Sequence, residues 1–205
     1  MTGRPRTTTL VPPVAGVKDP EYTHPLSLNR ADRSGGVVCV SGSEYGRMRF
    51  TLIDRITEWQ PGKSLKAVKY LTLAEEYLAD HFPTFPVMPG VLMLETVVEA
   101  GAWLWRTTDD FSHSVIAMRE AKNVKYGTFM QPGHALEISV ELVKQEGSLA
   151  TFRGKGNVQG GGQTVSAQVT LTKYNAQDKN PALAGVDEKL IAHWRERFAW
   201  LTGPR

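Results

Sequence analysis

Cysteine is almost absent from this sequence, which contains only Cys39 among its 205 residues. A single cysteine excludes an intramolecular disulfide and any metal site built from several thiolates. The N-terminal residues also lack the continuous apolar stretch of a secretory signal. We therefore expect a reducing compartment, and the cytoplasm is the predicted location.

Long hydrophobic runs are missing as well. The most apolar stretch covers residues 87–105, but it contains Pro89, Glu95 and Glu99. A helix that faces lipid would bury these residues only at high cost, so no membrane partner is expected.

An excess of positive charge is also lacking, since 24 Lys and Arg against 21 Asp and Glu give a formal net charge of only +3. The densest basic run, Arg195-Glu196-Arg197, is interrupted by an acid. Proteins that bind nucleic acid usually concentrate Lys and Arg on one face, so no nucleic-acid partner is predicted. A weakly basic surface is still suited to an acidic carrier protein.

The composition divides the chain into three parts. Residues 1–44 hold five Pro, five Gly and one aromatic residue, Tyr22, which predicts a poorly structured extension with one candidate edge strand at residues 36–40. Residues 45–175 are expected to form the folded domain. Residues 176–205 are expected to form a linker and an amphipathic helix over 187–201.

Apolar periodicity predicts the elements of the domain. Strand-like segments run from Met48 to the turn at residues 60–62, from Leu65 onward, and over 113–126, 135–146, 149–159 and 163–174. A helix over 91–105 is apolar on nearly every face, which is typical of a buried helix. These elements predict an α+β fold in which an antiparallel sheet wraps around one long central helix.

The segment before this helix is stiff. Pro83, Pro86 and Pro89 fall within seven residues and favour an extended backbone, which would hold His81 in a defined place. With an ordinary pKa of about 6.5, a histidine held in this way is suited to act as a general base.

The start of the helix has the composition of an oxyanion site. The first N–H groups of a helix have no acceptor within it, and Gly90 has no side chain to keep another molecule's carbonyl away from them. Glu95 lies five residues further along, where burial would raise its pKa and keep it protonated as an acid.

At these residues the sequence resembles a known family. The motif His81-Phe82-Pro83, the segment 86–92 and Glu95 are similar to the signature of the hotdog-fold 3-hydroxyacyl-[acyl-carrier-protein] dehydratases of the FabZ type. The similarity covers residues 48–173. Without gaps it includes residues 52–55, 61–63, 69, 72 and 75, and downstream it continues at residues 124–126 and 132–133.

The resemblance implies dehydration of a 3-hydroxyacyl thioester to the trans-2-enoyl thioester, without a metal or redox cofactor. The acyl group would be carried on the phosphopantetheine of an acyl carrier protein. His81 takes the place of the family's base and Glu95 that of its catalytic carboxylate, while Gly90 with Val91 supplies the thioester-polarising N–H. In the family the two side chains that face one substrate come from different subunits, which implies a homodimer or a trimer of dimers.

Three residues depart from the family pattern. Asp80 and Thr84 replace glycines on either side of the His-Phe-Pro motif, and Glu99 replaces a glutamine. Glu95 and Glu99 are neighbours at i, i+4 of a helix, so one of the two carboxyls is expected to hold a proton. Glu99 is therefore predicted to modulate the site.

Two other functions remain open at this point. A hotdog thioesterase would use a carboxylate of the central helix to activate water and would need neither His81 nor the Pro-rich segment. A non-catalytic acyl-binding module would explain the departures at Asp80, Thr84 and Glu99. A metal site is not expected, because Asp80, His81, Glu95 and Glu99 do not match a standard ligand spacing.

Overall fold

The computed structural model describes residues 51–203. In this range six strands form one sheet, in which every neighbouring pair is antiparallel and the order is β1-β2-β4-β5-β6-β3. The strands are β1 (Arg55–Gln60), β2 (Ser64–Tyr70), β3 (Val115–Tyr126), β4 (Ala135–Glu146), β5 (Leu149–Val158) and β6 (Gln163–Tyr174). The predicted extension, residues 1–44 with its candidate strand, lies outside the described residues.

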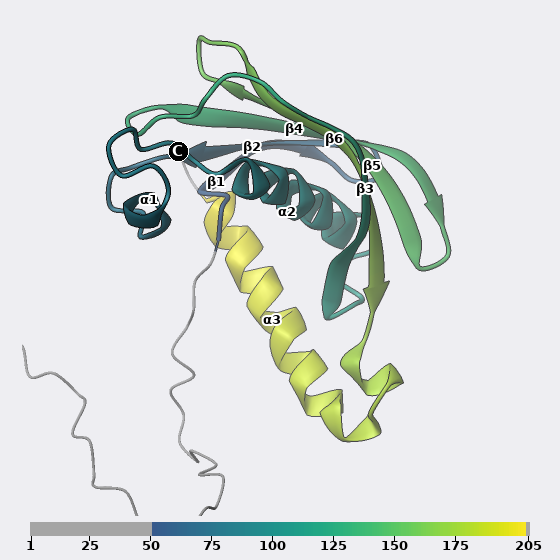
Figure 1. Cartoon of the computed structure of the whole chain (residues 1–205). Coiled ribbons are helices and arrows are strands. Elements are labelled where there is room, and N and C mark those ends of the chain that lie inside the picture. The colour runs from purple at the N-terminus through teal and green to yellow at the C-terminus, as the bar shows by residue number, and fades with distance from the viewer. Residues whose placement is uncertain (1–50, 204–205) are drawn as a thin grey trace, which may run out of the picture. The chain divides into compact units, whose positions relative to one another are not determined.

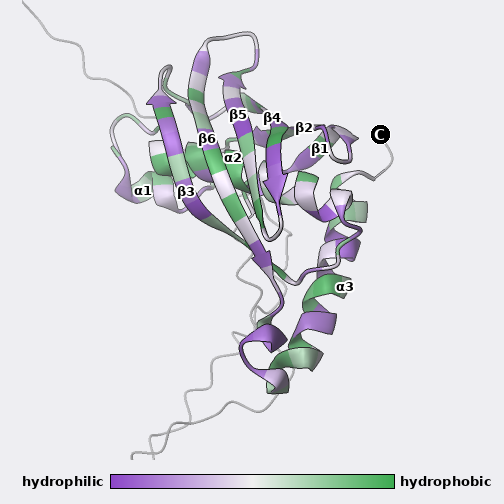
Figure 2. Ribbon diagram, turned by 90° about the vertical axis from the view of Figure 1, so that its right-hand side faces the viewer, coloured by the Kyte–Doolittle hydropathy of each residue, from purple (hydrophilic) through white to green (hydrophobic). Residues whose placement is uncertain are grey.

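The long helix α2 (Gly90–Thr108) lies against the concave face of this sheet, which curves around it (Figure 1). Burial alternates along the strands, as in β5, and Figure 2 shows the corresponding alternation of hydrophobic and hydrophilic residues. Trp103 and Trp105 of α2 are 1% and 0% exposed in the core, where the ring of Trp105 lies 6.0 Å from that of Phe152 in β5. The predicted α+β architecture is confirmed, and the two tryptophans serve packing, as large buried aromatics usually do.

The helix and the sheet approach each other closely at Gly154 of β5. A Cβ atom at this position would lie 2.2 Å from Cγ1 of Val97 in α2. No side chain fits into that space, so the absence of a side chain at Gly154 sets how deeply α2 enters the sheet.

The predicted first strand is wrong at its beginning. Leu52 and Ile53 are buried, at 2% and 0% exposure, but β1 starts only at Arg55. The N–H of Leu52 donates to the carboxylate of Glu99 in α2 over 2.8 Å. Leu52 is thus bonded to the helix, whereas the N–H of Asp54 donates to the C=O of Val68 in β2 over 2.9 Å. An apolar pattern alone does not distinguish such a buried segment from a strand.

The C-terminal residues form two short 3-10 turns (Ala176–Asp178 and Pro181–Leu183) and the helix α3 (Ala184–Leu201). The helix predicted at 187–201 is thus confirmed and begins three residues earlier. Its apolar side packs on the domain: the ring of Trp194 contacts Trp103, and that of Phe198 contacts Trp59, Trp103 and Phe111.

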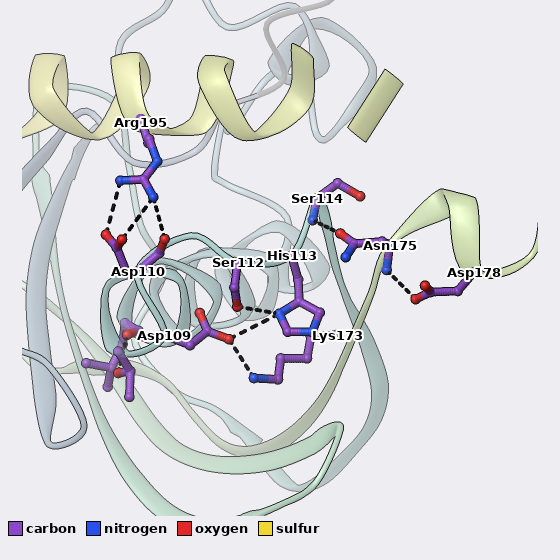
Figure 3. Close-up of polar contacts among 11 residues, drawn as sticks. Asp109, Asp110, Ser112, His113, Ser114, Lys173, Asn175, Asp178 and Arg195 are labelled. Carbon is purple, nitrogen blue, oxygen red and sulfur yellow. Dashed lines mark hydrogen bonds and ion pairs between the residues drawn. The ribbon is translucent and has the colours of Figure 1, made fainter. Parts of the chain in front are cut away.

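Polar contacts fix the same helix to the end of α2. Figure 3 shows the guanidinium of Arg195 in α3 paired with Asp110, at 3.1 Å from each carboxylate oxygen. Asp187, which is buried in the first turn of α3, accepts hydrogen bonds from the hydroxyl of Ser114 and from the N–H groups of Ala176 and Gln177.

Among residues 51–203 no helix combines the length and the apolar character needed to cross a membrane.

Candidate active site

His81 follows the short helix α1 (Tyr77–Asp80) and is half-buried. Its ring lies 4.5 Å from the ring of Phe82, measured between centroids. Phe82 has a φ of 50°, in the left-handed region, and its C=O accepts a hydrogen bond of 2.8 Å from the N–H of Phe85. The sharp turn at Phe82 therefore fixes the direction in which the chain leaves His81.

The proline-rich segment is tied to the loop that follows β3. The N–H of Met88 donates to the C=O of Met130 over 2.8 Å, and both methionines are buried. The ring of Phe85 meets that of Phe129 edge to face, with centroids 5.9 Å apart. The segment thus has a fixed path from His81 to α2, as its prolines predict.

Helix α2 begins at Gly90, with Pro89 as its N-cap residue. The C=O of Pro89 accepts from the N–H groups of Leu92 and Met93, at 3.0 and 3.1 Å. Within residues 51–203 the N–H groups of Gly90 and Val91 have no acceptor. The Val91 side chain is 68% exposed, so this end of the helix is open to a ligand oxygen.

Tyr126, at the end of β3, is a residue of this region that the sequence analysis did not assign. Its ring lies over Gly90, where an added Cβ would approach the ring carbons to 3.1 Å. The side chain is 50% exposed. Tyr126 lies within the family resemblance at residues 124–126, but no role follows from the sequence, because its contact with Gly90 depends on the pairing of β3 with β6.

Glu95 is half-buried in α2, and burial raises the pKa of its carboxyl above the ordinary value. At 1.5 Å per residue it lies about 7.5 Å along the helix axis from Gly90. Across the described residues no hydrogen bond or ion pair joins Glu95 to His81 within one chain. The geometry places the acid and the free N–H groups on one helix and the histidine on the segment before it.

The carboxylate of Glu99 turns toward the protein and not toward solvent. Its Oε2 accepts from the N–H of Leu52 at 2.8 Å, and its Oε1 accepts from Nε1 of Trp103 at 3.4 Å. Burial raises the pKa of Glu99 to about 7, and the negative charge of Glu95 contributes to this rise. The two hydrogen bonds and the positive charge of Arg197 act in the opposite direction.

The other two departures from the family pattern cause no backbone strain. Asp80 is the exposed last residue of α1, and Thr84 lies exposed inside the turn after Phe82. Neither has a positive φ, so neither position requires glycine.

Two other features lie apart from this arrangement. A hollow on the β1–β2 hairpin is lined by Glu58, Trp59, Gln60, Ser64 and Lys66. The tip of that hairpin contacts Thr108 through the N–H of Gly62 at 2.7 Å, about 27 Å along α2 from Gly90. Residues 51–203 bring no three His, Cys, Asp or Glu side chains together as a candidate metal site.

Comparisons with known proteins agree with this geometry. The model of the FabA-like domain matches residues 46–169. A 3-hydroxyacyl-[acyl-carrier-protein] dehydratase FabZ of Levilactobacillus brevis is 33% identical over 133 residues, which cover 65% of this chain and 89% of that protein. The FabZ of Bacillus subtilis is 35% identical over 126 residues, covering 62% of this chain and 87% of that protein.

A solved structure also shares the fold. A chain of the dehydratase heterocomplex ApeI:P from Xenorhabdus doucetiae superposes with a TM-score of 0.54 at 13% identity, over 65% of this chain and 90% of that chain. The sheet that wraps one long helix is the predicted hotdog fold. With a matching family model over more than half of its length and relatives at 33–35% identity, the chain belongs to the FabA-like family.

Proposed function

We propose that this protein is a hydro-lyase that dehydrates a 3-hydroxyacyl thioester, carried on an acyl carrier protein, to the trans-2-enoyl thioester. The observation that carries the proposal is the start of α2: two N–H groups without acceptors lie between a fixed histidine and a half-buried glutamic acid. The curated relatives are named for this reaction, and this chain covers 87–89% of two of them.

The chemistry follows from the three groups. A thioester oxygen that accepts from the N–H groups of Gly90 and Val91 would be stabilised as negative charge develops on it, which makes the α proton easier to remove. His81 would take that proton as the general base. Glu95 would donate its proton to the β-hydroxyl, which leaves as water. The carbon–oxygen bond breaks as the double bond forms, and no electrons are exchanged with a cofactor.

A second copy of the chain is part of the proposal. His81 and Glu95 are not joined within one chain, which suits a site shared between two subunits. Four apolar side chains near the proposed substrate site are strongly exposed, as surfaces that a partner covers often are: Phe82, Phe85, Val91 and Phe129. We propose a homodimer, alone or in a trimer of dimers.

The acyl group would arrive on the phosphopantetheine of the acyl carrier protein. The cytoplasm remains the proposed location of the protein.

One experiment separates this function from a thioesterase. The full chain is incubated with a 3-hydroxyacyl thioester of acyl carrier protein, and enoyl thioester and free thiol are measured in the same sample. We expect enoyl thioester without release of thiol, and hydration when the enoyl thioester is supplied instead. Release of thiol at the same rate as loss of substrate would contradict the proposal, as would the absence of any turnover.

A further inference from the structure

The inward side of β2 includes a lysine. Leu65 and Ala67 occupy the first two buried positions of this strand and are each 1% exposed, and Lys69 follows them at 4% exposure. A lysine is almost never buried to this extent unless its ammonium group is paired. Removing the charge from water is costly, so packing alone does not explain a lysine at this position.

The ammonium group of Lys69 is paired with two carboxylates. Its Nζ donates to Oε1 of Glu75 at 2.5 Å and lies 3.6 Å from Oδ2 of Asp54. Asp54 is itself fixed to β2, because the same oxygen accepts from the N–H of Tyr70 at 2.6 Å. Glu75 lies in the loop that follows β2, so the Lys69–Glu75 bond joins the sheet to this loop.

The loop leads directly to His81 through α1. The C=O of Glu75 accepts from the N–H of Leu78 at 3.0 Å, so the short helix begins beside the residue that Lys69 binds. Helix α1 has four residues and no side-chain hydrogen bond at its N-cap. A helix of this length is not stable by itself. Its position therefore depends on contacts with the rest of the domain, among them the core packing of Leu78 and the ion pair of Glu75.

We propose that Lys69 is a positioning residue, whose ion pair with Glu75 holds α1 and thereby keeps His81 in the place from which it acts as the base. The inference rests on the proposed function for the role of His81. Apolar packing of Leu78 has no preferred direction, whereas a charge-assisted hydrogen bond has one. The lysine itself is buried and bonded to protein carboxylates, so it does not contact the substrate.

The first test separates kcat from KM. Lys69→Met keeps the length of the side chain and removes its charge, and Glu75→Met removes the acceptor. Each should lower kcat about 10²-fold, the loss typical of a reacting group displaced by about 1 Å, while KM for a 3-hydroxyacyl thioester of acyl carrier protein stays within about twofold. A higher KM at unchanged kcat would contradict the inference.

Two neighbours provide matched controls. Lys66 is an exposed lysine of the same strand, whose ion pair with Glu58 is exposed on both sides, and Glu76 is the exposed residue next to Glu75. Lys66→Met and Glu76→Met should keep the kinetics of the wild type. A loss of kcat in these controls equal to that in Lys69→Met would show a general effect of charge removal and overturn the role of the buried pair.

The second test combines Lys69→Met with His81→Ala. If Lys69 acts through the histidine, its replacement in a chain that has no histidine at position 81 should lower kcat further by less than about threefold, because residues that act as a unit are not additive. A further loss of about 10²-fold in that background would show that Lys69 supports the site in general and does not position His81.

The double variant Lys69→Met with Glu75→Met separates positioning from stability. It leaves no unpaired charge between the two side chains, so its free energy of unfolding should be close to that of the wild type. Its kcat should stay low, because the directed bond to α1 is missing. Recovery of kcat together with stability would overturn the inference. This variant also provides the test if Lys69→Met alone does not fold.

Hydrogen exchange tests the placement of α1 without turnover. The N–H groups of Leu78 and Ala79 donate to the C=O groups of Glu75 and Glu76 at 3.0 and 3.1 Å. Their exchange should be faster in Lys69→Met than in the wild type and in Lys66→Met, while the amides of α2 stay protected. Unchanged exchange at Leu78 and Ala79 would refute the inference. A wild-type chain that dehydrates nothing would instead contradict the proposed function, and the exchange rates would still decide whether Lys69 holds α1.

Discussion

The ring of Tyr126 covers Gly90, so that a Cβ added to the glycine would lie 3.1 Å from the nearest ring carbon. This contact joins the end of β3 to the first turn of α2, where the N–H groups without acceptors lie. The backbone of Gly90 has no positive φ, so the glycine is needed there for space and not for conformation.

Gly90→Ala should therefore impair turnover far more than stability. The half-exposed Tyr126 ring has room to move away from the new methyl group, but the methyl group also narrows the approach to the N–H groups of the helix. We expect kcat/KM for dehydration to fall about 10²-fold, the loss typical of a reacting group displaced by about 1 Å. Gly185→Ala is the control, because a Cβ at Gly185 of α3 meets nothing within 4 Å. Equal activity of both variants would contradict this role of Gly90.

Gly154→Ala tests the packing of α2 into the sheet. The new methyl group would lie 2.2 Å from Cγ1 of Val97, which should lower the free energy of unfolding by about 1–3 kcal/mol, as overpacking usually does. Chemical denaturation of the single variant and of the double variant Gly154→Ala with Val97→Ala measures the effect. The double variant should be more stable than the sum of the two single changes predicts; simple additivity would show that this contact does not limit the approach of α2.

Glu99 should make stability depend on pH. Its pKa is raised from 4.5, the value expected in the unfolded chain, to about 7 in the folded chain. Between pH 4.5 and pH 7 the native state therefore binds more protons than the unfolded state. The free energy of unfolding should therefore decline as pH rises through this window, by roughly 1–3 kcal/mol relative to Glu99→Gln. Urea titrations of both proteins at pH 5 and pH 8 check the sign. A difference between them that does not change with pH would show that Glu99 titrates normally.

The sequence predicts most of this fold because its signals are local. The strand-like segments at residues 135–146 and 163–174 match β4 and β6, and Pro89-Gly90 marks the start of α2. Leu52 and Ile53 show the limit of that approach. Their apolar character predicts burial correctly, but the partner of the Leu52 N–H is a carboxylate 47 residues away.

The candidate site likewise contains residues that the sequence identifies and residues that only the structure reveals. His81, Gly90, Val91 and Glu95 are found from one contiguous motif, and their roles remain proposals. The contact of Tyr126 with Gly90 joins β3 to α2 and no local pattern predicts it. Trp103 and Glu99 are i, i+4 neighbours of α2, but the aromatic rings of α3 that contact Trp103 lie about 90 residues further along the chain.

Mixing of subunits tests whether one site uses two chains. His81→Ala and Glu95→Gln should each be inactive alone. After the two variants are unfolded together and refolded in equal amounts, half of the dimers should contain one of each, with one intact site of two. About a quarter of the wild-type activity is then expected from the symmetry of a twofold dimer. No recovery, with mixed dimers demonstrated by a tag on one variant, would place both side chains of a site in the same chain.

The rate of enoyl thioester formation by His81→Ala is the most direct test of the central claim. A general base contributes about 10² to 10⁴ to the rate, so this variant should lose at least about 10²-fold in kcat on a 3-hydroxyacyl thioester while its circular dichroism and melting temperature stay those of the wild type. His134→Ala, a change at an exposed histidine of the loop before β4, should keep full activity. A folded His81→Ala protein that dehydrates at close to the wild-type rate would contradict the mechanism.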